Sequence, residues 1–496
     1  MDRFFLFFIF GIVVVAAIPR GIELLNHNYL FLFDQGLFFE AVKNIVVDHN
    51  PTLIGSEVGG QGGFFQGPGW YYLLAVPFSL SGGDPYASMI VMFIIGVMTI
   101  VTSIFLMRKM FSTVTGLIVG LLIAISPAIV AQSRFIWPPF PISLITVVFI
   151  FFLYKVFEKK QKFFPLVTLT IGVMSHFEMA TAGIFLIQLF IIVPILYFKK
   201  LVSLRYLTLG GISFLLTQIT LIIFDLRHQF IISNGILGLV LSKSEVQTDA
   251  SKHIKSIFLN HIDVFKFNFL STFGLSDLLW PLLIIFLIAG TISFVKDKKQ
   301  KTEQKHLVIY LALSPIVFFL VLMLYLKPIW EWWILQLPIF YCFLLGILIV
   351  YLWRKAILRP IIVGLVLILV GFFINHSITL YKNDFYDYGG TAKIKGKLAA
   401  IDFIYKDAKQ KPFGLLVFTP PIYTYAYDYL LWWHAERKYN YKPYSEKKGT
   451  FYLLIEPDPQ KPWSYKGWLE TVVKSGKILN TEELPSGFIV QKRIEE

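Results

Sequence analysis

The side chains that could do chemistry in this 496-residue chain are few, because 56% of its residues are hydrophobic and only 15% are charged. Those that flank long apolar runs, with their polar and aromatic neighbours, are Asp34, Gln35, Arg134, Trp137, His176, Glu178, Arg227, His228 and Lys327. A guanidinium can bind two phosphate oxygens at once, and a carboxylate can accept the proton of an incoming hydroxyl. Together these groups would suit an anionic lipid phosphate and an attacking hydroxyl.

Each of these residues also has a purely structural interpretation. Asp34 precedes an amphipathic stretch and could simply be the N-cap of a helix. Arg134 lies close to Trp137 in the sequence and could anchor the chain at a membrane interface. His176 could be a hydrogen-bonded turn residue. These alternatives stay open at the level of the sequence.

The later basic residues have similar alternatives. Asp225 and Arg227 could pair with each other. Lys327, between Tyr325 and Trp330, is typical of a lysine whose stem lies along apolar surface while its charge stays in water.

Eleven apolar runs are candidates to span a bilayer, which needs about 20 mostly apolar residues. They cover approximately residues 4–24, 84–107, 113–131, 140–157, 163–177, 178–198, 206–224, 277–295, 307–326, 334–353 and 360–380. The first run resembles a cleavable signal peptide, but we interpret it as an uncleaved first helix. The sequence therefore predicts a polytopic α-helical membrane protein with about 11 transmembrane helices.

Lysine and arginine are concentrated in alternate connections between these runs. The connections that begin with the N-terminus hold 18 of them, and the others hold nine spread over much longer sequence. The positive-inside rule then places the N-terminus in the cytoplasm and the C-terminal segment outside the cell membrane. The net charge of +14 is explained by these loops, so we expect no nucleic acid as a partner.

Three long regions are predicted to lie outside: residues 25–83, 225–276 and 381–496. In the first, apolar residues after Asp34 recur at helical spacing, which predicts an interfacial helix. We therefore divide the chain into a transmembrane module, 1–380, and a soluble extracytoplasmic domain, 381–496.

The soluble segment is predicted to be a small α/β domain. Its β-type runs are 413–419, 450–455, 477–483 and 487–493, and its helical stretches are 392–407, 424–437 and 464–475. The chain has a single cysteine, Cys342, so no intramolecular disulfide can form and this domain must fold by its own core.

Several short motifs carry a resemblance to a known family. They are the acidic residue that opens the amphipathic helix, Phe65-Gln66-Gly67-Pro68-Gly69-Trp70-Tyr71-Tyr72, Ser126-Pro127, Ser133-Arg134-Phe135-Ile136-Trp137-Pro138, Ser175-His176-Phe177-Glu178 and Phe224-Asp225-Leu226-Arg227-His228-Gln229-Phe230. In this order, residues 1 to about 380 resemble the GT-C superfamily of integral-membrane glycosyltransferases, closest to its family 39-like bacterial members, relatives of protein mannosyltransferases and aminoarabinose transferases. The tail is similar to bacterial tails of this group through Trp432-Trp433 and Ile455-Glu456-Pro457-Asp458.

The resemblance implies transfer of a sugar from a polyprenyl-phosphate carrier to a lipid, glycan or protein acceptor, with inversion. Asp34 matches the general base of such enzymes. Arg134 matches a donor-phosphate ligand, assisted by Arg227, His228 and Lys327; Gln35, Trp137, His176 and Glu178 would line the site. The family often has a second carboxylate after the first and an Asn after the Trp, where this chain has Gln35 and Pro138. The first difference disfavours a metal-dependent mechanism. The sequence predicts no definite cofactor, and a divalent metal stays open as an alternative.

The main alternative, from another class, is a multi-pass lipid or solute transporter. Such a protein should show an internal repeat and polar residues near the membrane midplane, and this sequence shows neither clearly. A non-catalytic membrane scaffold is a third interpretation, and it fits poorly with the ionisable pair His176 and Glu178 in a short turn.

Overall fold

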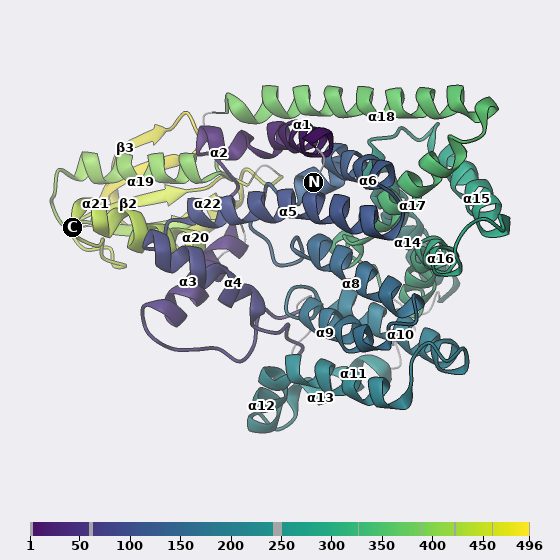
Figure 1. The fold of residues 1–496 in the computed structure, drawn as a ribbon. Helices are drawn as coiled ribbons and strands as arrows, with labels where there is room; N and C mark the ends of the chain where they lie inside the picture. Colours follow the sequence, from purple (N-terminus) through teal and green to yellow (C-terminus); the bar gives the residue numbers. More distant parts are fainter. Residues whose placement is uncertain are drawn as a thin grey trace. The chain divides into compact units, whose positions relative to one another are not determined.

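The structure is a computed structural model that describes residues 3–58, 63–241, 250–325, 327–387, 389–420, 423–458 and 460–495. Contacts within the chain divide it into two compact units. Figure 1 shows the helices and strands coloured along the sequence. Unit 1 contains residues 1–20, 52–70 and 92–379, and unit 2 contains residues 21–51, 71–91 and 380–496.

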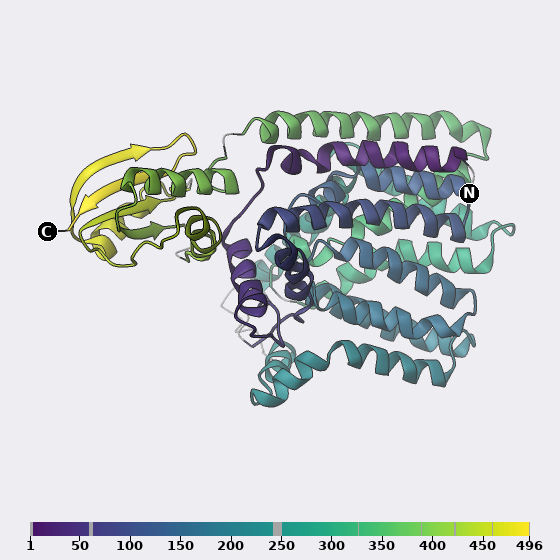
Figure 2. The same ribbon diagram turned by 60° about the vertical axis from the view of Figure 1, so that its left-hand side comes forward.

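Unit 1 is built from helices that lie side by side (Figure 2). They are α1 (Arg3–Arg20), most of α5 (Pro85–Met110), α6 (Thr113–Ile125), α7 (Pro127–Ala131), α8 (Ile142–Phe157), α9 (Phe164–Met174), α10 (Met179–Phe198), α11 (Leu204–Thr217), α12 (Ile219–Arg227), α13 (Ile231–Leu241), α14 (Ala250–Phe273), α15 (Trp280–Lys296), α16 (Thr302–Leu322), α17 (Leu337–Leu352) and α18 (Arg359–Leu380). Short 3-10 turns at Gln161–Phe163, Glu331–Ile334 and Ala356–Leu358 connect some of them.

Among the described residues, six helices are long and apolar enough to cross a bilayer, and the bent pair α11–α12 makes a seventh. These helices make the chain an integral membrane protein. Helices α6, α8 and α15, and α9 with its preceding 3-10 turn, are apolar but shorter. Each of the eleven predicted runs contains a helix, but a count of about eleven spans stays a prediction. Some predicted runs are broken: the run 113–131 divides at Ser126 because Pro127 starts a new helix.

The core of unit 1 surrounds α17, in which 15 of 16 residues are buried. An apolar helix without a polar face is expected at such a central position. Gly346 allows α17 to approach α6 closely, because a Cβ there would lie 2.5 Å from the side chain of Val119 in α6. The free thiol of Cys342 is buried in the same helix.

Arg20, the last residue of α1, is fully buried. Its guanidinium donates hydrogen bonds to the carbonyl oxygens of Ala16 (3.0 Å), Ile123 (3.1 Å) and Ala124 (2.7 Å). The last two carbonyls belong to the C-terminal turn of α6, where carbonyls have no intrahelical partner and a positive charge is favourable. This buried charge therefore caps the end of α6.

Helix α14 lies in the second predicted outer region and was not expected from the sequence. Its His261 is buried, with Nδ1 2.7 Å from the carbonyl oxygen of Ile257 and Nε2 3.1 Å from that of Leu322. Asn268 donates a hydrogen bond to the carbonyl of Ile334. Helix α14 is thus held against α16 and the 331–334 turn.

Unit 2 combines α2 (Ile22–Asn26), α3 (Phe33–Val46) and most of α4 (Gly69–Ser81) with the C-terminal segment. That segment holds α19 (Ile394–Ala408), β1 (Gly414–Phe418), α20 (Tyr425–Leu430), α21 (Glu436–Tyr439), β2 (Thr450–Ile455), α22 (Ser464–Trp468), β3 (Lys477–Glu483) and β4 (Ile489–Ile494), with π-helical turns at Tyr381–Phe385, Leu431–Ala435 and Leu469–Val473. A small C-terminal sheet with accompanying helices is therefore present, as predicted. The division of the chain into 1–380 and 381–496 stays a prediction.

The four strands form one mixed sheet in the order β1-β2-β4-β3. Strand β2 pairs parallel to β1 and antiparallel to β4, and β4 pairs antiparallel to β3. On one face, Phe451, Leu453 and Ile455 pack with Val473. On the other, the Tyr452 hydroxyl donates a 2.6 Å hydrogen bond to Asp407 in α19. Burial on both faces explains why β2 is almost continuously apolar.

Candidate functional site

Asp34 is the second residue of α3, in unit 2. The N-cap is Leu32, and its backbone N–H donates a 2.8 Å hydrogen bond to Oε1 of Gln35. Asp34 is therefore not the N-cap, which removes the structural alternative given for it. Its partly buried carboxyl has no hydrogen bond or ion pair within the described part of the chain, and burial raises its pKa above the usual value. A base that is not already paired with a cation can accept a proton.

The helix that carries Asp34 is fixed against the C-terminal domain within unit 2. A Cβ at Gly36 would lie 2.2 Å from the backbone nitrogen of Ala426, so α3 and α20 touch through their backbones. The Phe33 ring packs 5.4 Å from the rings of both Tyr423 and Tyr425. Since rigid packing fixes the direction of the neighbouring side chain, the C-terminal domain orients Asp34.

Trp432 makes a second connection between α4 and the C-terminal segment. Its ring stacks on Phe78 at 6.1 Å, and the ammonium of Lys43 in α3 lies 5.2 Å from its centre. This tryptophan belongs to the motif that resembles the bacterial tails. Its contacts join α3, α4 and the C-terminal domain within unit 2.

His176, in unit 1, is held by hydrogen bonds on both ring nitrogens. Nδ1 accepts from the backbone N–H of Gly69 at 3.1 Å, and Nε2 donates to the carbonyl of Thr217 at 2.7 Å. This pattern, one nitrogen accepting and the other donating, fits a neutral imidazole. Of the two interpretations of His176, a site residue or a hydrogen-bonded turn residue, the structure favours the second.

Glu178 is the N-cap of α10, and its carboxylate accepts a 3.2 Å hydrogen bond from the backbone of Ala180. It is 2% exposed and has no cationic partner within the described ranges.

Arg134 and Trp137 follow α7. The Trp137 ring lies 5.3 Å from Trp332, and the side chain of Gln132 donates a 3.0 Å hydrogen bond to the carbonyl of Leu335. Arg134 is half-buried and near enough to His376 of α18 for their charges to interact.

The turn Glu331–Ile334 and the residues that follow it connect several of these elements. Thr181 of α10 donates a 2.9 Å hydrogen bond to the carbonyl of Trp333. Together with the bonds from Gln132 and Asn268, it ties α7, α10 and α14 to one turn. These three buried polar residues were missed from the sequence, although uncharged polar side chains at the ends of apolar runs are a usable signal.

At the end of α12, Asp225 does not pair with Arg227, so this alternative left open by the sequence is removed. Asp225 instead accepts hydrogen bonds from the backbone of Ile232 at 2.7 Å and from both donors of Ser233, which caps the start of α13. Arg227 is exposed and unpaired as far as the structure describes the chain. His228 is exposed; its Nδ1 donates to the carbonyl of Phe224 at 2.8 Å, so its Nε2 stays available.

Within unit 1, residues 63–70 contact both the end of α12, near Arg227 and His228, and the turn that holds His176. Phe65 packs 5.7 Å from Phe224, and the backbone N–H of Gly67 donates to the carbonyl of Ser175 at 3.1 Å.

Lys327 is exposed and has no ion pair among the residues that are described. Asp34 and Gln35 belong to unit 2, and the other seven predicted site residues belong to unit 1. Across the described ranges, no group of three or more His, Cys, Asp or Glu could hold a metal ion.

No protein-family model and no curated protein matches the sequence. Among solved structures, that of ArnT from Cupriavidus metallidurans bound to undecaprenyl phosphate matches with a TM-score of 0.59 and 10% identity, over 98% of this chain and 97% of that chain. The chain has the GT-C fold. Apo ArnT gives a TM-score of 0.48 at 13% identity over the same shares, 98% and 97%. The Archaeoglobus fulgidus oligosaccharyltransferase AglB, in complex with an inhibitory peptide and a dolichol-phosphate, gives 0.45 at 13% identity over 99% of this chain and 74% of that chain.

The GT-C fold agrees with the resemblance seen in the sequence motifs. Two of those motifs now have a structural reason that is independent of chemistry. Gly67 and Gly69 leave room for the His176 ring, and Asp225 caps α13. A motif in a GT-C fold can therefore reflect packing, and each residue needs its own functional test.

Proposed function

We propose that this chain is a polyprenyl-phosphate-sugar-dependent glycosyltransferase. The observation that carries the proposal is the full-length fold similarity to ArnT, whose solved structure holds undecaprenyl phosphate. The donor would be a hexose or pentose on a polyprenyl phosphate. The acceptor would be a hydroxyl of a lipid, glycan or protein at the outer face of the membrane, with the N-terminus cytoplasmic and the C-terminal domain extracytoplasmic.

Asp34 is the general base in this proposal. The acceptor oxygen attacks the anomeric carbon from the side opposite the phosphate, the bond from that carbon to the phosphate oxygen breaks, and the acceptor proton goes to Asp34. The anomeric configuration is inverted. The support is an unpaired, partly buried carboxyl on a helix whose position is fixed by Gly36 and Phe33. General-base assistance is worth about 10²–10⁴-fold in rate.

The donor phosphate is bound by Arg134, with Arg227, His228 and Lys327 as further ligands. The last three are exposed, so binding a phosphate costs them little desolvation. They would neutralise the charge that grows on the leaving phosphate.

Gln35, Trp137, His176 and Glu178 have positioning roles. Gln35 fixes the start of α3 through Leu32, and His176 fixes residues 67–69. Trp137 packs on Trp332. Glu178 caps α10.

The test uses the purified full-length protein in liposomes with a panel of synthetic undecaprenyl-phosphate sugars. We expect one donor to release undecaprenyl phosphate at a rate that depends on the acceptor, and NMR of the product to show inverted configuration. Movement of a lipid across the liposome without any sugar release would instead support the transporter alternative. A retained configuration would contradict the single displacement.

A further inference from the structure

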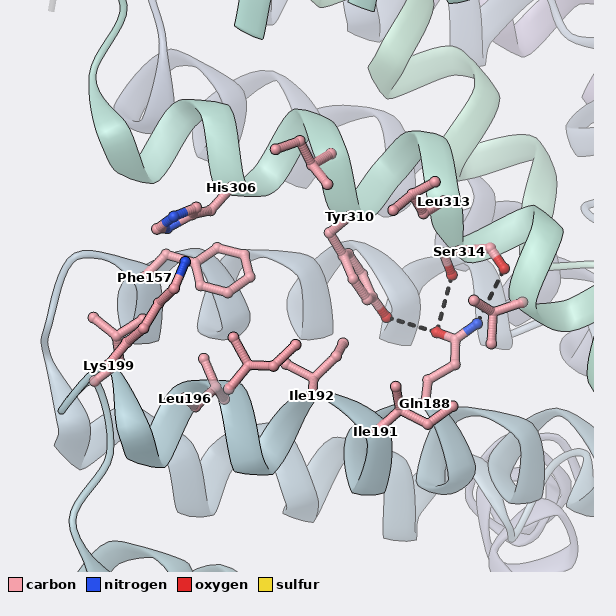
Figure 3. Close-up of a pocket in the computed structure, with 14 residues that line it drawn as sticks. Phe157, Gln188, Ile191, Ile192, Leu196, Lys199, His306, Tyr310, Leu313 and Ser314 are labelled. Atoms are coloured by element: carbon pink, nitrogen blue, oxygen red, sulfur yellow. Dashed lines mark hydrogen bonds between the residues drawn. The ribbon is translucent and has the colours of Figure 1, made fainter.

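A groove of about 340 Å³ lies between α10 and α16 in unit 1 (Figure 3). Its walls are aliphatic, mainly Ile191, Ile192 and Ile195 of α10 and Leu313 and Val317 of α16. Three of these side chains, Ile191, Ile195 and Leu313, are about half exposed. Because both helices are long and apolar enough to span a membrane, this side of the groove faces lipid.

The deep end of the groove is polar but satisfied by its own hydrogen bonds. The amide oxygen of Gln188 accepts from Tyr310 and from Ser314, each at 3.0 Å, and its nitrogen donates to the carbonyl of Ser314 at 3.1 Å (Figure 3). Because the Gln188 amide already has hydrogen-bond partners within the protein, this end of the groove needs no polar ligand. The part of an occupant that lies along the walls must therefore be apolar.

The other end of the groove is basic. It continues into a second cavity of about 740 Å³, and the two cavities share Phe157, Lys199, Leu201 and His306. Lys159 and Lys160 also line this second cavity, together with the carboxylates of Glu158 and Glu303. Figure 3 shows the Lys199 and His306 side chains at the end of the groove opposite Gln188.

Two positive groups at this end are available to a ligand. Glu158 is already paired with Lys155 at 2.9 Å and Lys160 at 2.8 Å. Lys199 and Lys159 have no ion pair within the described ranges. Nδ1 of His306 is buried without a hydrogen-bond partner among those residues. An apolar slot that ends in unpaired cations is complementary to a lipid with an anionic headgroup.

We propose that this groove binds an anionic glycerophospholipid, with one acyl chain along α10 and α16 and its phosphate at Lys199, Lys159 and His306. The site is separate from the residues proposed for sugar transfer. It lies at the end of unit 1 that carries the basic loops, so the lipid comes from the leaflet on that side. By filling the space between two helices, the lipid stabilises their packing.

The test compares groove variants with neighbours that do not line it. Leu313→Trp fills the slot, and Ile316→Trp places the same ring on the exposed face of the same helix. The purified protein is equilibrated in mixed micelles of phosphatidylglycerol and phosphatidylcholine, and retained lipid is quantified by mass spectrometry. We expect selective retention of phosphatidylglycerol by the wild type and by Ile316→Trp, and its loss in Leu313→Trp. Equal retention in both variants would overturn the proposal.

A second comparison tests the headgroup contact. Lys199→Gln should lower the preference for phosphatidylglycerol about fivefold, which corresponds to about 1 kcal/mol for one basic residue near a lipid surface. Lys200→Gln, at the adjacent exposed position outside the groove, should leave it unchanged. An equal loss in both would mean non-specific attraction, and displacement of the lipid by inorganic phosphate would mean a free-anion site. Either result would refute the lipid assignment.

Discussion

The imidazole of His176 occupies the space that a side chain on residue 67 would need. A Cβ at Gly67 would lie 2.3 Å from Nδ1 of His176, and one at Gly69 would lie 2.7 Å from its Cβ. The hydrogen bond from the Gly69 N–H to Nδ1 completes the contact. The glycine motif and the histidine motif, over 100 residues apart in the sequence, are two halves of one packing arrangement.

The substitution Gly67→Ala should destabilise unit 1 by about 1–3 kcal/mol, the usual cost of overpacking. Thermal unfolding in detergent measures the effect. Gly183→Ala, where a Cβ would meet nothing within 4 Å, serves as the matched control. Combining Gly67→Ala with His176→Ala should recover part of the loss, since the ring that causes the clash is then absent. No recovery would mean that Gly67 is needed for another reason.

The substitution Asp34→Asn should lower turnover by roughly a hundredfold or more, because it removes a general base worth about 10²–10⁴-fold. Asn is nearly the same size, and Asp34 is not the N-cap of α3. The protein should therefore remain folded and still bind the lipid donor. Initial rates and donor affinity are measured together. Turnover close to that of the wild type would exclude Asp34 as the base.

The pH dependence gives an independent check on the same residue. Asp34 acts as a base when deprotonated, so the rate should fall as the pH drops through its pKa. Burial raises that pKa, so this fall should lie at higher pH than for an ordinary aspartate. Glu40→Gln, on the same helix, is the control and should keep the profile. A profile that is flat in acid would contradict the assignment.

Glu456 should be essential to the C-terminal domain. It forms a 2.7 Å ion pair with Lys397, whose side chain is only 2% exposed, and it accepts a short hydrogen bond from Tyr427. Glu456→Gln leaves a buried ammonium without its counter-charge, which costs about 3–5 kcal/mol. Chemical unfolding followed by tryptophan fluorescence measures this loss. Glu470→Gln, at an exposed site, should be neutral, and the double replacement Lys397→Met with Glu456→Leu should cost less than Glu456→Gln.

The proposed orientation places Lys299 in the cytoplasm and Lys447 outside. Single Cys replacements at these positions should react with a membrane-impermeant reagent from opposite sides of the membrane. The native Cys342 is buried and should not react. Labelling of both positions from the same side would rule out this topology.

Hydropathy predicted the helix positions well, because lipid demands a long apolar run for each span. It predicted their lengths less well, since breaks such as Ser126-Pro127 depend on single residues. It missed α14, whose Lys, His, Asn and Asp residues lower its hydropathy although its inner face packs on α17. The strands were predicted almost to the residue, because β1 and β2 are short apolar runs and β3 and β4 flank a Pro-containing turn.

The candidate site was less predictable than the fold. Residue types indicated which side chains could act, but not what they contact. His176 and Asp225 were explained by partners at Gly69 and Ile232, and contacts at long sequence separation leave no local periodicity. The charge of Arg227 and the carboxyl of Asp34 have no ion pair within the described ranges. Their functional roles stay predictions.

The buried guanidinium of Arg20 has a consequence for biogenesis. Its partners Ile123 and Ala124 lie 103 and 104 residues further along the chain. At a synthesis rate of about 5–20 residues per second, they emerge roughly 5–20 s after Arg20. During that interval the Arg20 guanidinium lacks the carbonyl acceptors that α6 provides in the folded protein. Because Arg20 is the last residue of α1, its long side chain can reach interfacial water or lipid phosphate during that interval. It exchanges those partners for the carbonyls of α6 once α6 has been made.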